Sequence, residues 1–328
     1  GRTQYTAAVG TAALRDAIAA HYRDRWRVDV DPARIVVTAG ASAALSLACC
    51  ALIDPGRRVL LTDPGYPCNR HFVAAFDGIA HSVPVDAASR FQLTADLVRQ
   101  HWQPDTAGVL LASPANPTGT SAPFDEIAAI AETVRQRRGF LIVDEIYLGL
   151  SYSPRPRSAL ELGEDVIVIN SFSKYFSMTG WRLGWIVVPP ALAATFEKLA
   201  QNLYICASTL AQHAALACFA PESLQVFDAR RDEFRRRRDL LVPALRGLGF
   251  GVPAEPDGAF YVYADCSRFA GDSAAFAHEL LEQASVSVVP GYDFGRHRPE
   301  RHLRISYATA LPKIEEAIER IARFVKTR

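Results

Sequence analysis

Short runs of apolar and β-branched residues recur along the first part of the chain. Each is followed by a turn and then by a segment whose apolar positions have helical spacing. Several runs are apolar at consecutive positions, which is typical of strands that helices cover on both faces. The pattern therefore predicts an α/β fold, with a mostly parallel sheet sandwiched by helices. The predicted strands span residues 35–39, 59–61, 82–85, 109–112, 140–143, 166–170 and 183–188.

The pattern changes near Ala207, where a long helical region begins. Beyond Gly249 the alternation predicts a second, smaller α+β domain. We therefore divide the chain into a large domain at residues 1–206 and a second part at residues 207–328, which holds connecting helices and the small domain. Neither an internal repeat nor a low-complexity linker is present, so we expect the domains to pack closely. In the small domain, strands are predicted at 258–264, 286–289 and 303–307, and helices at 273–284 and 312–325.

Composition narrows the possible partners. Of the 328 residues, 49% are hydrophobic and 22% are charged, and 36 basic residues balance 35 acidic ones to a net charge of +1. Such a balance gives no long-range field for nucleic acid or an anionic membrane, so a small-molecule substrate is expected. The basic stretch at 230–238 is interrupted by acidic residues, which indicates a solvated helix face. No segment approaches the roughly 20 apolar residues of a membrane span.

The cysteines, histidines and chain start add three expectations. The six cysteines include no C-x-x-C pair, so we expect reduced thiols in a cytoplasmic protein. The histidines have no spacing typical of metal ligands, so no metal is expected. The first residue is Gly1 and the only methionine is Met178, so we expect that an N-terminal arm is missing from this sequence.

Lys174 lies in the most informative segment, S-F-S-K-Y-F-S-M-T-G-W-R-L-G-W at 171–185, directly after the predicted strand at 166–170. Ligands of α/β sheets bind where strands end. A lysine at such a place becomes a nucleophilic amine if burial and nearby positive charge lower its pKa. An isolated lysine here would more simply be a surface residue of a loop.

Polar residues follow two other predicted strands. Asp144 ends the apolar run F-L-I-V at 140–143, where an unpaired charge is costly and calls for a cationic partner. Its alternative role is to cap the next helix. Asn116 lies in S-P-A-N-P-T-G at 113–119, whose prolines and glycine alone predict only a turn.

Together these segments resemble the fold-type-I, pyridoxal 5'-phosphate (PLP)-dependent aminotransferases, the class I/II aminotransferase family. The resemblance covers nearly the whole chain, from G-R-T-Q-Y at 1–5 to L-R-I-S-Y-A at 303–308. It implies an aspartate-aminotransferase-like large domain and a ping-pong transfer of an amino group between an L-amino acid and a 2-oxo acid. Lys174 is then the residue that forms the Schiff base with PLP and carries the proton between substrate Cα and cofactor C4'.

The resemblance also implies the other site residues. Asp144 pairs with the pyridine nitrogen, Tyr147 and Asn116 bond to the phenolic oxygen, and Tyr66 stacks on the ring. Arg304 binds the substrate α-carboxylate through its planar fork, and Asn116 also faces the substrate. The working unit is expected to be a homodimer with shared active sites. The phosphate is assigned to the helix start at Ala41 and Ser42, together with Ser171, Ser173, Arg182 and, from the partner subunit, Tyr5.

Two alternatives stay open. The same scaffold supports C–S β-lyases, and an aminotransferase-like module also serves as the effector domain of some transcriptional regulators. The intact N-P-T-G turn and the D-E-I-Y at 144–147 favour a true aminotransferase. The amino acid and the 2-oxo acid that it uses are not predicted from the sequence.

Overall fold

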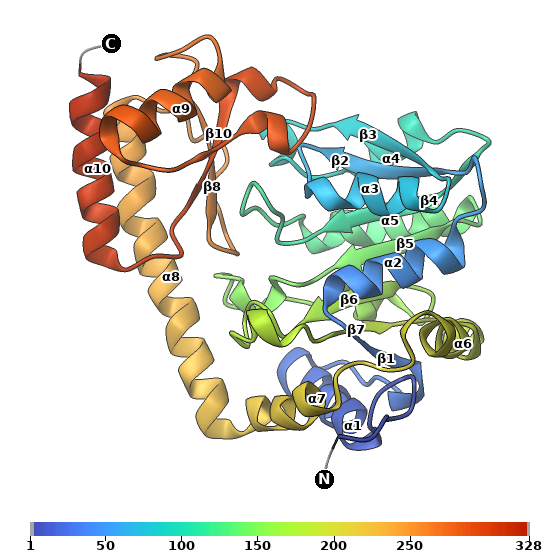
Figure 1. The fold of residues 1–328 in the computed structure, drawn as a ribbon. Helices are drawn as coiled ribbons and strands as arrows, with labels where there is room; N and C mark the ends of the chain where they lie inside the picture. The colour runs from blue at the N-terminus through green and yellow to red at the C-terminus, as the bar shows by residue number, and fades with distance from the viewer. Residues whose placement is uncertain (1–2, 327–328) are drawn as a thin grey trace.

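Two β-sheets of unequal size form the two domains of the computed structural model, which describes residues 3–326 (Figure 1). The larger sheet has seven strands in the order β1-β7-β6-β5-β4-β2-β3, and only β7 runs antiparallel to its neighbours. The smaller sheet has three antiparallel strands in the order β8-β10-β9. The predicted α/β class with a mostly parallel sheet is confirmed.

Every predicted strand of the larger sheet is present, although β3 and β4 begin three residues earlier than the apolar runs indicated. Those of the larger sheet are β1 (Ile35–Thr38), β2 (Arg58–Asp63), β3 (Ile79–Pro84), β4 (Thr106–Ala112), β5 (Phe140–Asp144), β6 (Ile167–Ser171) and β7 (Gly184–Val187). Those of the smaller sheet are β8 (Tyr261–Asp265), β9 (Val289–Pro290) and β10 (His302–Ser306).

Two strand predictions in the small domain were wrong at their starts. Residues 286–288 do not pair, because Val286 donates its N–H to Leu280 at the end of the preceding helix, and β9 begins only at Val289. Residues 258–260 are also outside β8. The N–H groups of Asp257 and Gly258 both go to the carbonyl of Gly119 in the large domain, so no ladder forms there.

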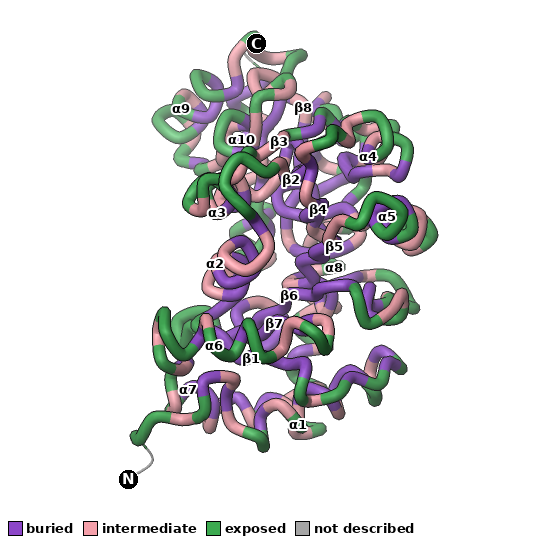
Figure 2. The backbone as a smooth tube through the Cα atoms, turned by 90° about the vertical axis from the view of Figure 1, so that its right-hand side faces the viewer, coloured by how far each residue is buried: buried purple, intermediate pink, exposed green. Residues whose placement is uncertain are grey.

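Helices cover both faces of the larger sheet (Figures 1 and 2). Neighbouring strand residues alternate between two apolar cores: Val36 packs with Leu45 on one face, and Val37 packs with Leu14 on the other. Strands β1, β5, β6 and β7 are therefore buried on both sides, as their continuous apolar runs require, whereas the edge strand β3 stays largely exposed. The helices are α1 (Ala12–His21), α2 (Ala41–Leu52), α3 (Pro67–Ala75), α4 (Ala95–His101), α5 (Phe124–Gln136), α6 (Ala193–Tyr204), α7 (Thr209–Ala215), α8 (Pro221–Leu248), α9 (Ser273–Ala284) and α10 (Leu311–Val325).

Helix α8 carries the chain from one domain to the other (Figure 1). Near its start, Phe227 packs in the core of the large domain, whereas Leu241 and Leu245 pack in the core of the small domain. Ala207 and Ala211 also bury their side chains in the large-domain core. The division at residues 206 and 207 stays a prediction.

The described residues 3–326 contain no helix that is both long and apolar enough to cross a membrane. Within the same residues no three His, Cys, Asp or Glu side chains gather as a metal site would require. Gly1 and Arg2, where the family resemblance begins, lie outside the described residues.

Candidate active site

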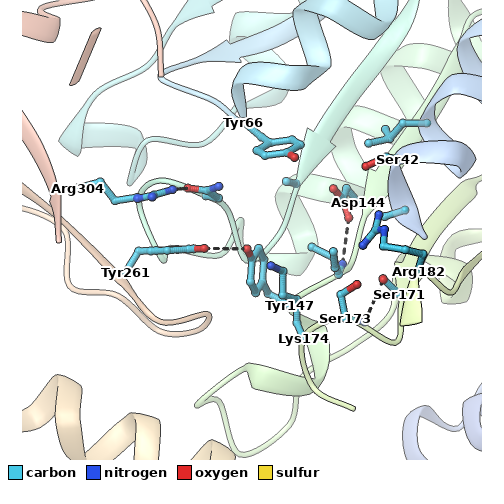
Figure 3. A pocket seen from close by; sticks show the side chains of 15 residues that line it. Ser42, Tyr66, Asp144, Tyr147, Ser171, Ser173, Lys174, Arg182, Tyr261 and Arg304 are labelled. Atoms are coloured by element: carbon cyan, nitrogen blue, oxygen red, sulfur yellow. Dashed lines mark hydrogen bonds between the residues drawn. The ribbon is translucent and has the colours of Figure 1, made fainter. Parts of the chain in front are cut away.

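A cavity of about 330 Å³ opens where strands β4, β5 and β6 end and the small domain approaches (Figure 3). Of the residues predicted for the site, all except Tyr5 line it. Tyr5 lies outside the cavity and is 78% exposed. The lining consists of Ala41, Ser42, Leu45, Tyr66, Ala112, Asn116, Asp144, Ile146, Tyr147, Ser171, Ser173, Lys174, Arg182, Tyr261 and Arg304.

Lys174 reaches the cavity from the irregular segment that follows β6. Its Nζ lies 5.9 Å from the ring centre of Tyr147 and 5.8 Å from that of Phe260. Burial lowers the pKa of this amine, and the positive charges of Arg182 and Arg304 lower it further, against the opposing effect of Asp144. A larger fraction of Lys174 is therefore neutral, as a nucleophilic amine must be.

Asp144 ends β5 inside the cavity and is only 5% exposed. Its Oδ1 accepts the N–H of Ile146 at 3.0 Å, a turn contact that uses one oxygen (Figure 3). Asp144 does not cap the next helix, because the short helix at Leu148–Leu150 has Tyr147 at its N-cap and no side-chain cap. Burial raises the pKa of Asp144 to about 6, although the Ile146 N–H and the Lys174 charge act in the opposite direction. A cation placed in the cavity would relieve this cost.

Arg304 enters the cavity from β10 of the small domain. One arm, Nη1, donates to Oδ1 of Asn116 at 2.9 Å, and the guanidinium lies over the rings of Tyr261 and Phe294 at 4.5 and 4.8 Å. Its Nε is buried and has no hydrogen-bond partner. The guanidinium is thus held in place while its Nε–H remains an unused donor. An oxyanion could accept a hydrogen bond from it.

The start of helix α2 forms a second polar corner of the cavity. Its N-cap is Gly40, which has no side chain to satisfy the free N–H groups of the first turn. A Cβ on Gly40 would lie 2.6 Å from Nη2 of Arg182, and one on Gly184 would lie 2.9 Å from the backbone N of Ala41. The two glycines therefore let a guanidinium and a helix N-terminus come together, which suits a phosphate.

The serine hydroxyls near this corner differ in whether they already have hydrogen-bond partners. Ser171 donates to the carbonyl of Leu183 at 3.1 Å and accepts the N–H of Ser173 at 3.1 Å, so its hydroxyl serves the fold. Within residues 3–326, the hydroxyls of Ser42 and Ser173 have no hydrogen-bond partner. These two are better placed than Ser171 to donate to a ligand.

Comparison with known proteins identifies the family. The family model described as aminotransferase class I and II matches residues 1–321. The chain belongs to this family.

A sequence match and a structural match both come from Mycobacterium tuberculosis. A protein named valine–pyruvate aminotransferase is 43% identical over 319 residues, 97% of this chain and 82% of its own length. An aminotransferase crystal structure superposes with a TM-score of 0.95 at 41% identity, covering 99% of this chain and 84% of the other. The aromatic aminotransferase structure from Pyrococcus horikoshii gives 0.94 at 32% identity, covering 100% and 89%.

The protein is therefore a transaminase of a PLP-dependent family, and its expected fold and reaction class are confirmed. The relatives are named as transaminases, which favours that activity over a β-lyase or a regulator domain. One relative is named a valine–pyruvate aminotransferase and another an aromatic aminotransferase, so family membership leaves the amino acid open.

Sequence reasoning missed Tyr261 of this aminotransferase site. Its hydroxyl lies 3.2 Å from that of Tyr147, and the Arg304 guanidinium lies over its ring at 4.5 Å. A signal was available, because the alternation along β8 sends Tyr261 and Tyr263 to the large-domain side and Val262 to the small-domain core. The apolar lining residues Leu45, Ala112 and Ile146 gave no signal that separates them from ordinary core residues.

Proposed function

We propose that this aminotransferase binds PLP covalently through Lys174 and moves an amino group between an L-amino acid and a 2-oxo acid. The observation that carries the proposal is the meeting of a lysine of lowered pKa and a buried carboxylate in one cavity. Lone lysines or aspartates occur in many folds. Their convergence beside an open helix N-terminus and an arginine with an unused donor is what this reaction requires.

The cavity has a fitting group for each part of the cofactor. The α2 N-terminus, Ser42, Ser173 and Arg182 suit the phosphate, with Ser171 supporting them. Asp144 can pair with the protonated ring nitrogen, and Tyr66 can stack on the face of the ring. Because Asn116 uses its amide oxygen on Arg304, its NH2 group is left to donate to the phenolic oxygen, together with the Tyr147 hydroxyl. When bound, the cofactor supplies an electron-accepting ring that stabilises negative charge at the substrate Cα.

The chain's own residues do the rest of the work. Arg304 binds the substrate carboxylate and, with Asn116, orients the substrate. With PLP bound, the Lys174 amine would accept the proton from the substrate Cα and carry it between Cα and the cofactor C4', and a depressed pKa favours such an acceptor. The Asp144 carboxylate keeps its negative charge beside the ring nitrogen.

We also propose a homodimer in which Tyr5 contributes to the phosphate site of the other subunit. Tyr5 is highly exposed, and the neighbouring segment at the end of α6 and start of α7 exposes Leu203, Ile205 and Leu210. The two segments are joined, since Thr209 donates to the carbonyl of Gln4 at 2.8 Å. An apolar patch of this kind is typical of a subunit interface.

For the substrates, we propose valine and pyruvate as the first pair to test, on the strength of the 43% identical relative. A panel of amino donors with pyruvate or 2-oxoglutarate, followed spectroscopically, would measure the preference. The cytoplasmic location expected from the cysteines stays a prediction, which cell fractionation would test.

Reduction with borohydride tests the role of Lys174 directly. We expect the reduced cofactor to remain attached to the peptide that contains Lys174, and Lys174→Ala to lose both the attachment and the activity. Lys198→Ala, in the exposed face of α6, is the matched control and should behave as the wild type. Finding the attached mass on another lysine would refute the proposal.

A further inference from the structure

Asp63 is a buried carboxylate that no part of the proposed reaction uses. It ends β2 of the large domain, is 5% exposed, and has no ion-pair partner within residues 3–326. Its oxygens instead accept backbone N–H groups of the small domain: Arg296 at 3.0 Å to each oxygen and His297 at 3.2 Å. A charge kept in such a place must have a partner, and here the partner is a loop of the other domain.

The approach of this loop depends on a glycine. A Cβ on Gly295 would lie 1.7 Å from Oδ1 of Asp63, so no other residue fits without displacing the carboxylate. Two residues after Asp63, Gly65 donates its N–H to the carbonyl of Phe294 at 2.9 Å. We call Asp63, Gly65 and residues 294–297 the interdomain latch.

The latch connects directly to the carboxylate-binding arginine. Phe294 is 3% exposed, and its ring lies 4.8 Å from the Arg304 guanidinium. On the large-domain side, Tyr66 lines the cavity three residues beyond Asp63. One set of hydrogen bonds thus ties the loop that supports Arg304 to the segment that carries Tyr66.

We propose that Asp63 is a positioning residue for substrate binding. It holds residues 294–297 against the large domain. Phe294 can then support the Arg304 guanidinium in the position from which it binds the substrate carboxylate. The proposal rests on the function proposed above for Arg304. Asp63 itself does not line the cavity, so we assign it no contact with substrate or cofactor.

Three substitutions test the latch in the holoenzyme. In Asp63→Ala the three N–H contacts are lost, and we expect KM for both amino acid and 2-oxo acid to rise about tenfold with kcat within about twofold. Asp63→Asn keeps one acceptor oxygen and should show a smaller rise of the same kind. Gly295→Ala attacks the contact from the small domain and should resemble Asp63→Ala. Hydrogen–deuterium exchange of the peptide containing 294–297 should quicken in each, while cofactor affinity is unchanged.

Asp86→Ala is the matched control, because Asp86 also accepts a backbone N–H, from Ala88, but within its own turn. It should leave KM and the exchange of 294–297 as in the wild type. Faster exchange with an unchanged KM in Asp63→Ala would show that the contact only holds the fold, and would overturn the proposal. So would a fall in kcat without a change in KM.

Arg304→Lys separates this proposal from the proposed function. If Arg304→Lys leaves KM unchanged, the role of Arg304 is wrong, whatever Asp63 does. If Arg304→Lys raises KM and Asp63→Ala does not, Arg304 keeps its role and the latch proposal fails. Should Asp63→Ala not fold, Asp63→Asn and Gly295→Ala carry the same test.

Discussion

The buried charge of Asp144 should lower the stability of the folded protein without the cofactor and raise it when the cofactor is bound. In the cofactor-free protein its pKa is raised from 3.8 to about 6, so the folded state binds this proton more tightly than the unfolded chain. The contribution of this group to stability is therefore present at low pH and is lost as pH rises from about 4 to about 6.

Asp144→Asn should then stabilise the cofactor-free protein above pH 6 by about 3 kcal/mol, because no charge remains buried. The difference should vanish near pH 4, where the wild-type group is already neutral. Denaturant unfolding across this pH range measures both. With PLP present the order should reverse, and turnover should fall severely since the ring nitrogen loses its counter-charge. An Asn variant that is equally stable at pH 4 and pH 8 relative to the wild type would contradict the assignment.

A second prediction at the scale of single residues concerns the planar geometry of the Arg304 guanidinium, as distinct from its charge. Arg304→Lys keeps the positive charge but loses the planar fork and the Nη1 bond to Asn116. KM should rise about tenfold or more for every amino acid of a donor panel, as expected for one lost charge-assisted hydrogen bond. A rise confined to a few donors would assign Arg304 to the side chain of the substrate instead of its carboxylate.

At the scale of single residues, the sequence predicted the side chains of the site that have reactive or charged groups. Lys174, Asp144 and Asn116 each follow a strand and carry a recognisable motif, and the structure brings them to one cavity. What a motif could not reveal was which atoms are already in use. The hydroxyl of Ser171 is bonded to Leu183, and that depends on where β7 passes, not on the neighbours of Ser171 in the sequence.

At the scale of elements, the helix α2 and the strand before it form the proposed phosphate site. Gly40→Ala should weaken PLP binding at least tenfold, because the new methyl would displace the Arg182 guanidinium 2.6 Å away. Gly56→Ala is the matched control. Both glycines have a positive φ, +82° and +77°, but nothing lies within 4 Å of a Cβ at position 56. Both variants bear the strain of a positive φ, and only Gly40→Ala should lose cofactor affinity when titrated with PLP. An equal loss in both would trace the effect to backbone strain.

Elements with a strong apolar run were predictable, and those decided by distant contacts were not. The strand β5 is apolar at consecutive positions and lies where its sequence indicated. The start of β8 was placed too early because the N–H of Gly258 bonds to Gly119, which is far away in the sequence. Patterns along the chain report burial, but they do not report which partner a backbone group finds across a domain boundary.

At the scale of the whole molecule, the site is shared between domains. Arg304 and Tyr261 come from the small domain, whereas Asn116 and Tyr147 come from the large one, and hydrogen bonds join the pairs. The relative placement of the domains therefore sets the distance between Arg304, the proposed substrate-binding arginine, and Lys174. The contacts of Asp63 with residues 296 and 297 and the helix α8 are among the features that join the two domains.

The proposed dimer extends this sharing to a second chain, and mixing two inactive or weakened variants tests it. If Tyr5 acts on the partner, a dimer of one Lys174→Ala and one Tyr5→Phe subunit has one site with both defects and one with neither. Random pairing of equal amounts should then restore about a quarter of the wild-type sites. If Tyr5 served its own subunit, each site of the mixed dimer would carry one defect, and mixing would add nothing to the activity of the separate variants. Light scattering on the same samples supplies the control, since a fully active monomer would exclude sharing altogether.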